Sequence, residues 1–153
     1  MKIEIPKVIV QVSLAEYAPE LQGSALHVWV NPSMAKLNVY NNLVTELQEQ
    51  ELTAARKILM PEQEPAKKDA SAFSAIFAEV GRWLKVRKEE KPQGVAAPML
   101  AWYAEIWSQG PQDTHWTVDE LRMLEQADPS FLSWMIARTW QARAEHMEQK
   151  KKV

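Results

Sequence analysis

The chain has 153 residues, of which 46% are hydrophobic and 25% charged, a length and balance typical of one soluble globular domain. The absence of cysteine excludes disulfides, thiolate metal sites and thiol nucleophiles, and a net charge of −2 argues against a dedicated nucleic-acid binder. No apolar run approaches the roughly 18 residues of a membrane span, and no signal peptide is evident, so we expect a soluble intracellular protein.

The first thirty residues predict a short antiparallel β element. Apolar and polar residues alternate in part over residues 2–12, and a second apolar stretch covers residues 25–30. Strands this close in sequence most economically pair with each other in antiparallel fashion. Because an isolated hairpin is only marginally stable, we expect this sheet to pack on other elements or to gain strands from another chain.

A long helix is predicted over residues 31–60. Asn31 and Pro32 suit the N-cap and the first helical position. At 1.5 Å per residue such a helix is about 43 Å long, so it needs a partner along its length. Its apolar stripe supplies five candidate self-association residues, which predict a homo-oligomer: Leu37, Tyr40, Val44, Leu47 and Ile58.

The rest of the chain predicts a polar linker at 61–70, a helical bundle at 71–149 and a short tail at 150–153. Local signals mark its helices: an apolar face at 73–84, Pro98 with Gly110-Pro111 as the C-terminal stop, the capping box of Thr117 and Glu120, and Asp128-Pro129. The expected fold is therefore α+β and predominantly α-helical, a single domain of residues 1–153 with about five helices after the β element.

The sequence carries no recognisable catalytic chemistry. Its three histidines, His27, His115 and His146, are not spaced as a metal-binding pair, and no nucleophile or phosphate-binding motif is present. The carboxylates fall on polar helix faces or in linkers, where nothing would shift a pKa for acid–base work. We therefore expect a non-enzymatic protein without a metal or cofactor.

Tryptophan is the residue type that suggests a function. Five of the seven tryptophans lie in the last third of the chain: Trp102, Trp107, Trp116, Trp134 and Trp140. They suit either the core of a three-helix unit or a protein-binding surface, because exposed indoles are strong interface anchors. Trp102 and its neighbour Tyr103 would point about 100° apart on a helix, which disfavours burial of the whole set. These five tryptophans are the candidate partner-binding residues.

The segment from 96 to 143 resembles the tail assembly chaperones of long-tailed bacteriophages of the siphophage type. The similar stretches are Leu100-Ala101-Trp102-Tyr103-Ala104-Glu105-Ile106-Trp107, Trp116-Thr117-Val118-Asp119-Glu120-Leu121, Asp128-Pro129-Ser130-Phe131-Leu132-Ser133-Trp134 and Arg138-Thr139-Trp140. The resemblance implies a small α+β protein that binds and solubilises the tape-measure protein during tail morphogenesis. It also implies the tail-tube protein as a further partner, a location in the host cytoplasm, and absence from the mature virion. Residues 32–70 match no feature of that family.

Three alternatives remain open at this point. A head–tail completion protein would form rings and stay in the particle. A small DNA-binding regulator would use a helix–turn–helix made of residues 118–126 and 129–148, although the second helix begins with apolar residues in place of base-reading side chains. An enzyme would need a site assembled from scattered residues. The tail assembly chaperone is the interpretation that we favour, and it predicts no nucleic-acid partner and no membrane partner.

The self-association stripe generates a first prediction. Leu47→Asp places a charge in the middle of the predicted helix–helix contact and should lower the mass of the oligomer, measured by sedimentation equilibrium. An unchanged mass would show that the stripe is not the interface.

Overall fold

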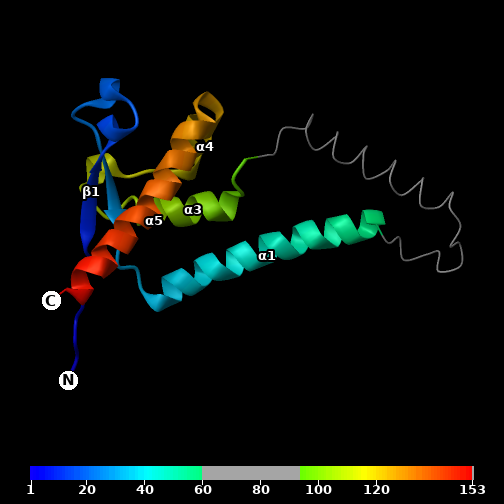
Figure 1. The fold of residues 1–153 in the computed structure, drawn as a ribbon, viewed down its shortest axis with the longest axis horizontal. Helices are drawn as coiled ribbons and strands as arrows, with labels where there is room; N and C mark the ends of the chain where they lie inside the picture. Colours follow the sequence, from blue (N-terminus) through cyan, green and yellow to red (C-terminus); the bar gives the residue numbers. More distant parts are fainter. Residues whose placement is uncertain (60–93, 153) are drawn as a thin grey trace, which may run out of the picture. The chain divides into compact units, whose positions relative to one another are not determined.

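The computed structural model describes residues 1–59 and 94–152 (Figure 1). They contain two strands, β1 (Ile9–Ser13) and β2 (Ala25–Trp29), and four α-helices, α1 (Met34–Leu59), α3 (Ala97–Ile106), α4 (Val118–Ala127) and α5 (Pro129–Lys151). The predicted class, α+β and predominantly helical, is confirmed. The described residues hold four helices where the sequence predicted about five, and the helix expected at 73–84 and the linker at 61–70 lie outside them.

The chain divides into two compact units, Met1–Tyr40 with Val95–Val153, and Asn41–Gly94. The first unit contains the sheet, the first residues of α1, and helices α3, α4 and α5. The second unit contains the remainder of α1, residues 41–59, which with Gly94 is the part of this unit that the structure describes. No helix among the described residues is both long and apolar enough to cross a membrane.

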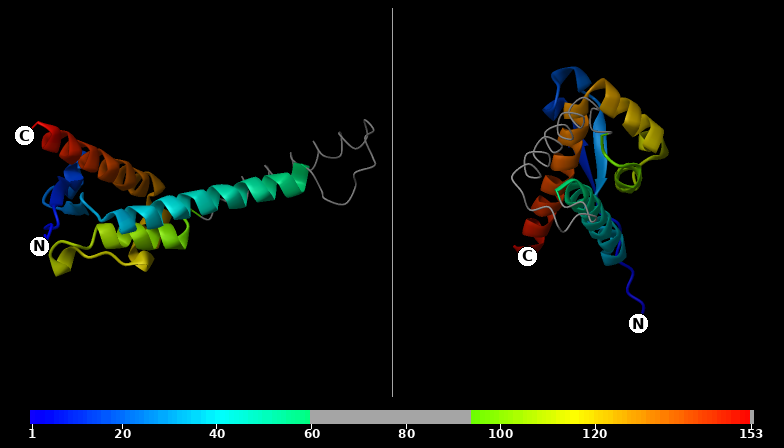
Figure 2. Two further views of the ribbon diagram at one scale, coloured as in Figure 1. Left: turned by 90° about the horizontal axis from the view of Figure 1, so that it is seen from below. Right: turned by 90° about the vertical axis from the view of Figure 1, so that its right-hand side faces the viewer.

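The two strands form an antiparallel hairpin that buries one face. Val12 lies opposite Leu26 and Val10 opposite Val28, and Val12, Leu26 and Val28 are almost fully buried. Helix α5 lies against β2 (Figure 2). The core is completed from the three C-terminal helices by side chains that are at most 1% exposed: Leu100, Ile106, Trp107, Leu121, Leu132 and Met135.

The first strand is shorter than its sequence pattern predicts, and Asn31 explains why. The Asn31 side chain accepts a hydrogen bond from the Val8 amide (2.6 Å) and donates one to the Pro6 carbonyl (3.0 Å). It thereby closes the open end of the hairpin, and residues 1–7 form no regular element. Asn31 is consequently not the N-cap of the long helix: α1 begins at Met34, and the Ser33 hydroxyl accepts from the Lys36 amide (3.2 Å).

The predicted starts of the last two helices are confirmed. The Thr117 hydroxyl accepts from the Glu120 amide (3.2 Å) and donates to the Glu120 carboxylate (3.0 Å) at the start of α4. The Asp128 carboxylate accepts from the Phe131 amide (3.3 Å) at the start of α5. Both caps satisfy amides that have no partner within the helix.

Gly110 does not stop α3, contrary to the sequence prediction. The helix ends at Ile106, and Gly110 lacks the positive φ of a C-terminal glycine cap. Its role is close packing, because a Cβ on Gly110 would lie only 2.9 Å from Cγ of His27.

This contact predicts that Gly110→Ala destabilises the first unit. The added methyl would overlap the imidazole. Overpacking of this kind lowers the free energy of unfolding by about 1–3 kcal/mol. Denaturant unfolding measures the loss. If the His27 contact is its cause, the double variant Gly110→Ala/His27→Ala should be more stable than the sum of the two single losses allows, and simple additivity would contradict this explanation.

Candidate functional site

Five aromatic side chains form what we call the inner aromatic cluster. They come from α1, from α3 and the residue that follows it, and from α5: Tyr40, Trp102, Tyr103, Trp107 and Trp140. The Tyr40 ring lies 4.6 Å from that of Trp102 and 4.9 Å from that of Trp140. Tyr103 stacks on Trp107 with ring centroids 5.1 Å apart. These contacts join the beginning of α1 to the other two helices.

Each indole N–H in the inner aromatic cluster has a hydrogen-bond acceptor. Trp107 donates to the Thr139 hydroxyl (2.8 Å), Trp102 to the Lys36 carbonyl (2.9 Å) and Trp140 to the Tyr103 hydroxyl (2.9 Å). The polar groups of the cluster are thus satisfied within the protein itself, as buried indoles require.

Tyr103 is the centre of this network. Its hydroxyl accepts from Trp140 and donates to the Tyr40 hydroxyl (3.2 Å). Burial, followed by the hydrogen bond with Tyr40, raises the pKa of Tyr103 well above its ordinary value of 10.0. The Tyr103 phenol therefore stays neutral at any physiological pH. Its two hydrogen bonds within the cluster give it a structural role.

The five candidate partner-binding tryptophans separate into two groups. Trp102 and Trp107 are 4% and 0% exposed, so their indoles face the core. The other three, Trp116, Trp134 and Trp140, are half-buried. The prediction of partner contact therefore rests on these three, of which Trp140 also serves the inner aromatic cluster.

The candidate self-association residues lie in both units. Leu37 and Tyr40 belong to the first unit, where Tyr40 is part of the inner aromatic cluster. Val44, Leu47 and Ile58 belong to the second unit, and all five side chains are half-buried. Self-association through this stripe stays a prediction.

A second group of rings, the outer aromatic cluster, consists of Tyr17, Phe131 and Trp134. Tyr17 stacks on Phe131 with centroids 4.8 Å apart and lies 5.6 Å from Trp134. Its hydroxyl donates to the Asp128 carboxylate (3.0 Å), and this hydrogen bond raises the pKa of Tyr17. Phe131 is 9% exposed and the other two rings are half-buried. The cluster thus presents a partly exposed aromatic surface.

Sequence analysis missed Tyr17 as a member of this surface. The residue lies in the connection between the two strands, and only folding brings it to the start of α5. Glu16, in the same connection, also contacts α5, because Arg138 donates a hydrogen bond to its carboxylate (2.9 Å). The only signal available in the sequence was the presence of one aromatic residue in this connection.

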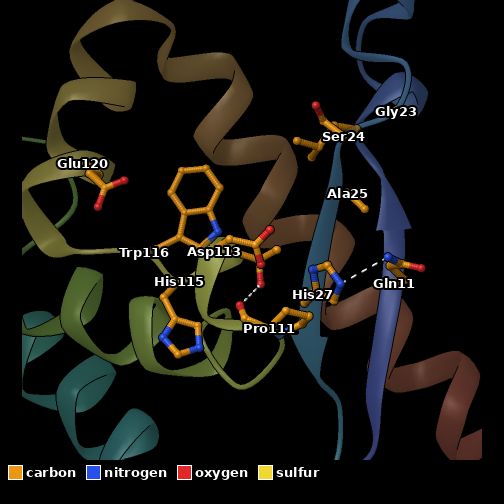
Figure 3. Close-up of a pocket in the computed structure, with 12 residues that line it drawn as sticks. Gln11, Gly23, Ser24, Ala25, His27, Pro111, Asp113, His115, Trp116 and Glu120 are labelled. Atoms are coloured by element: carbon orange, nitrogen blue, oxygen red, sulfur yellow. Dashed lines mark hydrogen bonds between the residues drawn. The ribbon is translucent and has the colours of Figure 1, made fainter.

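A cavity of about 610 Å³ lies beside β2, bordered by the loop that precedes α4 (Figure 3). His27 and Gln11 line one side, with Nε2 of each 3.2 Å apart, and Trp116 and Asp113 line the other. Nδ1 of His27 is buried without a hydrogen-bond partner. Among the described residues no three histidine, aspartate or glutamate side chains are placed to hold a metal ion.

Comparison of the chain with protein-family models, with curated proteins and with solved structures finds no match.

The buried hydrogen bond at Trp107 gives a prediction for stability. Thr139→Val keeps the side-chain shape but removes the acceptor, which leaves a buried indole N–H unpaired at a cost of about 1–3 kcal/mol. The Thr139 hydroxyl also donates to the carbonyl four residues earlier, that of Met135 (2.7 Å). The matched control is Thr45→Val, because the exposed Thr45 hydroxyl makes the same kind of bond to the Asn41 carbonyl (3.0 Å) but accepts from no indole. Chemical denaturation should show the loss for Thr139→Val only, and equal effects of the two substitutions would contradict the assignment.

Proposed function

We propose that the protein is a non-enzymatic chaperone of phage tail assembly, which binds the tape-measure protein in the host cytoplasm and is absent from the finished virion. The family resemblance over residues 96–143 carries the proposal. In the structure that stretch comprises α3, α4 and most of α5, which pack together in the first unit. The resemblance therefore covers a contiguous structural unit that also bears two rings of the outer aromatic cluster.

The outer aromatic cluster supports a role in binding an apolar, helical client. Tyrosine and tryptophan offer large contact areas at little cost in conformational entropy, and they dominate the energetics of interfaces. Met123 on α4 and Met147 on α5 are 68% and 42% exposed. Flexible methionines adapt to varied partners, as a protein that coats a long client at many positions must do.

The packing of α5 disfavours the DNA-binding alternative. In a helix–turn–helix protein the first turns of the second helix enter the major groove and contact base edges. Here Phe131 and Leu132, in the first turn of α5, are only 9% and 1% exposed. The exposed residues of that turn are Pro129 and Ser130, which offer little for base recognition.

The experiment that tests the proposal is recovery of the tagged protein from cells that produce all the tail proteins, with identification of co-purified chains by mass spectrometry. The wild type should retain the tape-measure protein. Trp134→Ala should reduce the amount retained at least about tenfold, because loss of an interface tryptophan costs 1.4 kcal/mol or more.

The matched control is Trp29→Ala, which removes another half-buried indole of the first unit, outside the outer aromatic cluster. It should retain the client, and thermal unfolding must show both variants folded. Equal retention by the two variants would remove the outer aromatic cluster from the interface. Recovery of tube or connector proteins alone would indicate a structural component, and recovery of DNA would indicate a regulator.

A further inference from the structure

The start of α1 is attached to the rest of the first unit by a few side-chain contacts. Trp102 donates to the Lys36 carbonyl (2.9 Å), and Tyr103 donates to the Tyr40 hydroxyl (3.2 Å). The Lys36 ammonium pairs with the Glu105 carboxylate. Close backbone packing in the described residues joins α3 to α4 and α4 to α5, whereas α1 reaches α3 and α5 mainly through long side chains.

These contacts hold α1 weakly. None of its side chains from Met34 to Leu59 is buried, and Leu37 and Tyr40 are half-buried. The Glu105 side chain is 54% exposed, so its ion pair with Lys36 adds little stability. Segments with few buried apolar contacts open at a low cost in free energy. By this measure the start of α1 detaches more easily than α3, α4 or α5, each of which carries buried side chains.

The surface that the start of α1 covers is aromatic. Trp102 and Tyr103 are only 4% and 2% exposed. The Trp140 ring stacks on that of Trp102, with centroids 5.8 Å apart and planes at 11°. Tyr40 contacts both indoles, at 4.6 Å and 4.9 Å between ring centroids. Departure of α1 would therefore uncover two stacked indoles and leave the Trp102 N–H without its acceptor.

The groups that α1 presents show what this surface accepts. They are the ring of Tyr40 and, one helical turn earlier, the carbonyl of Lys36. An amphipathic helix of another chain can offer the same pair, a ring or other large apolar side chain and a carbonyl one turn before it. The apolar, helical client of the proposed chaperone is a partner of this kind.

We propose that the first two turns of α1 are a releasable plug over Trp102 and Trp140, and that a helix of the client displaces them. The identity of the displacing helix rests on the proposed function, whereas the plug itself does not. While α1 is docked, the protein covers its own client-binding indoles, which limits association through an exposed apolar patch before the client is present. Client binding then shifts the protein to the undocked state.

A fluorescently labelled synthetic peptide of residues 31–47 tests the plug, because it carries the same groups as α1. A plug that fills the surface about 90% of the time weakens a competitor about tenfold. Full-length Tyr40→Ala, whose α1 lacks the ring that contacts both indoles, should therefore bind the peptide about tenfold more tightly than the wild type in anisotropy titrations. The matched control is Val39→Ala, a neighbour that is 50% exposed, which should bind like the wild type.

A crosslink gives the opposite test. The variant Lys36→Cys/Glu105→Cys, joined by a short bismaleimide, keeps α1 docked, because these two side chains are paired and the natural chain has no other cysteine. Crosslinking should weaken peptide binding at least about tenfold relative to the same variant before the reaction. Thermal unfolding must show every variant folded.

The plug is overturned if Tyr40→Ala binds the peptide no more tightly than the wild type, or if crosslinking leaves the affinity unchanged. It is also overturned if a peptide that itself carries Tyr40→Ala binds as well as the natural peptide.

Recovery of the tape-measure protein separates this proposal from the proposed function. Tyr40→Ala should retain more of that client than the wild type, and the crosslinked chain less, whereas simple destabilisation by Tyr40→Ala would lower retention. If the peptide results are as expected but no chain retains the client, the plug is supported and the chaperone function fails. If the wild type retains the client but the peptide does not distinguish the variants, the plug fails and the chaperone function stands.

Discussion

The need to pair one buried indole N–H organises the first unit. Trp107 has no exposed surface, and its nitrogen donates to Thr139 on α5, which fixes the register of α3 against α5. From there the inner aromatic cluster continues to Tyr40 and to the backbone of Lys36, whose ammonium also pairs with Glu105. The start of α1 is thus set by the same packing. Tryptophan can serve as a core residue in this way only where the neighbouring helix supplies an acceptor.

The helix starts that sequence analysis predicted correctly depend on neighbours within a few residues. Thr117 and Asp128 cap helices through amides three positions on, so their role is visible locally. Asn31 and Gly110 were misassigned because distant residues determine what they do. The Val8 amide that Asn31 binds lies 23 positions away, and Gly110 packs on His27, which is 83 positions (110 − 27) earlier in the chain. The usual helix-end preferences of Asn-Pro and Gly-Pro were overridden by these tertiary contacts.

The outer aromatic cluster was only partly predictable, because its members also come together through tertiary contacts. Trp134 lies off the helix face that carries Phe131, Leu132 and Met135, which predicts its partial exposure. No comparable local signal predicts that Trp107 is fully buried. Tyr17 joins Trp134 only because the strand connection reaches the start of α5. Sequence composition could show that there are many indoles for a small core, but their assignment to core or surface requires the tertiary arrangement.

The polar contacts of the β element reach very far along the chain. Tyr17 bonds Asp128 at a separation of 111 residues, Glu16 bonds Arg138 at 122, and Lys7 bonds Gln109 at 102. During translation the hairpin therefore leaves the ribosome long before the residues that hold it in place, and contacts of such separation form late in folding. Until the last helix has been synthesised, the nascent chain carries an unsupported strand pair with both edges available, a state in which premature pairing with a neighbouring chain competes with correct folding.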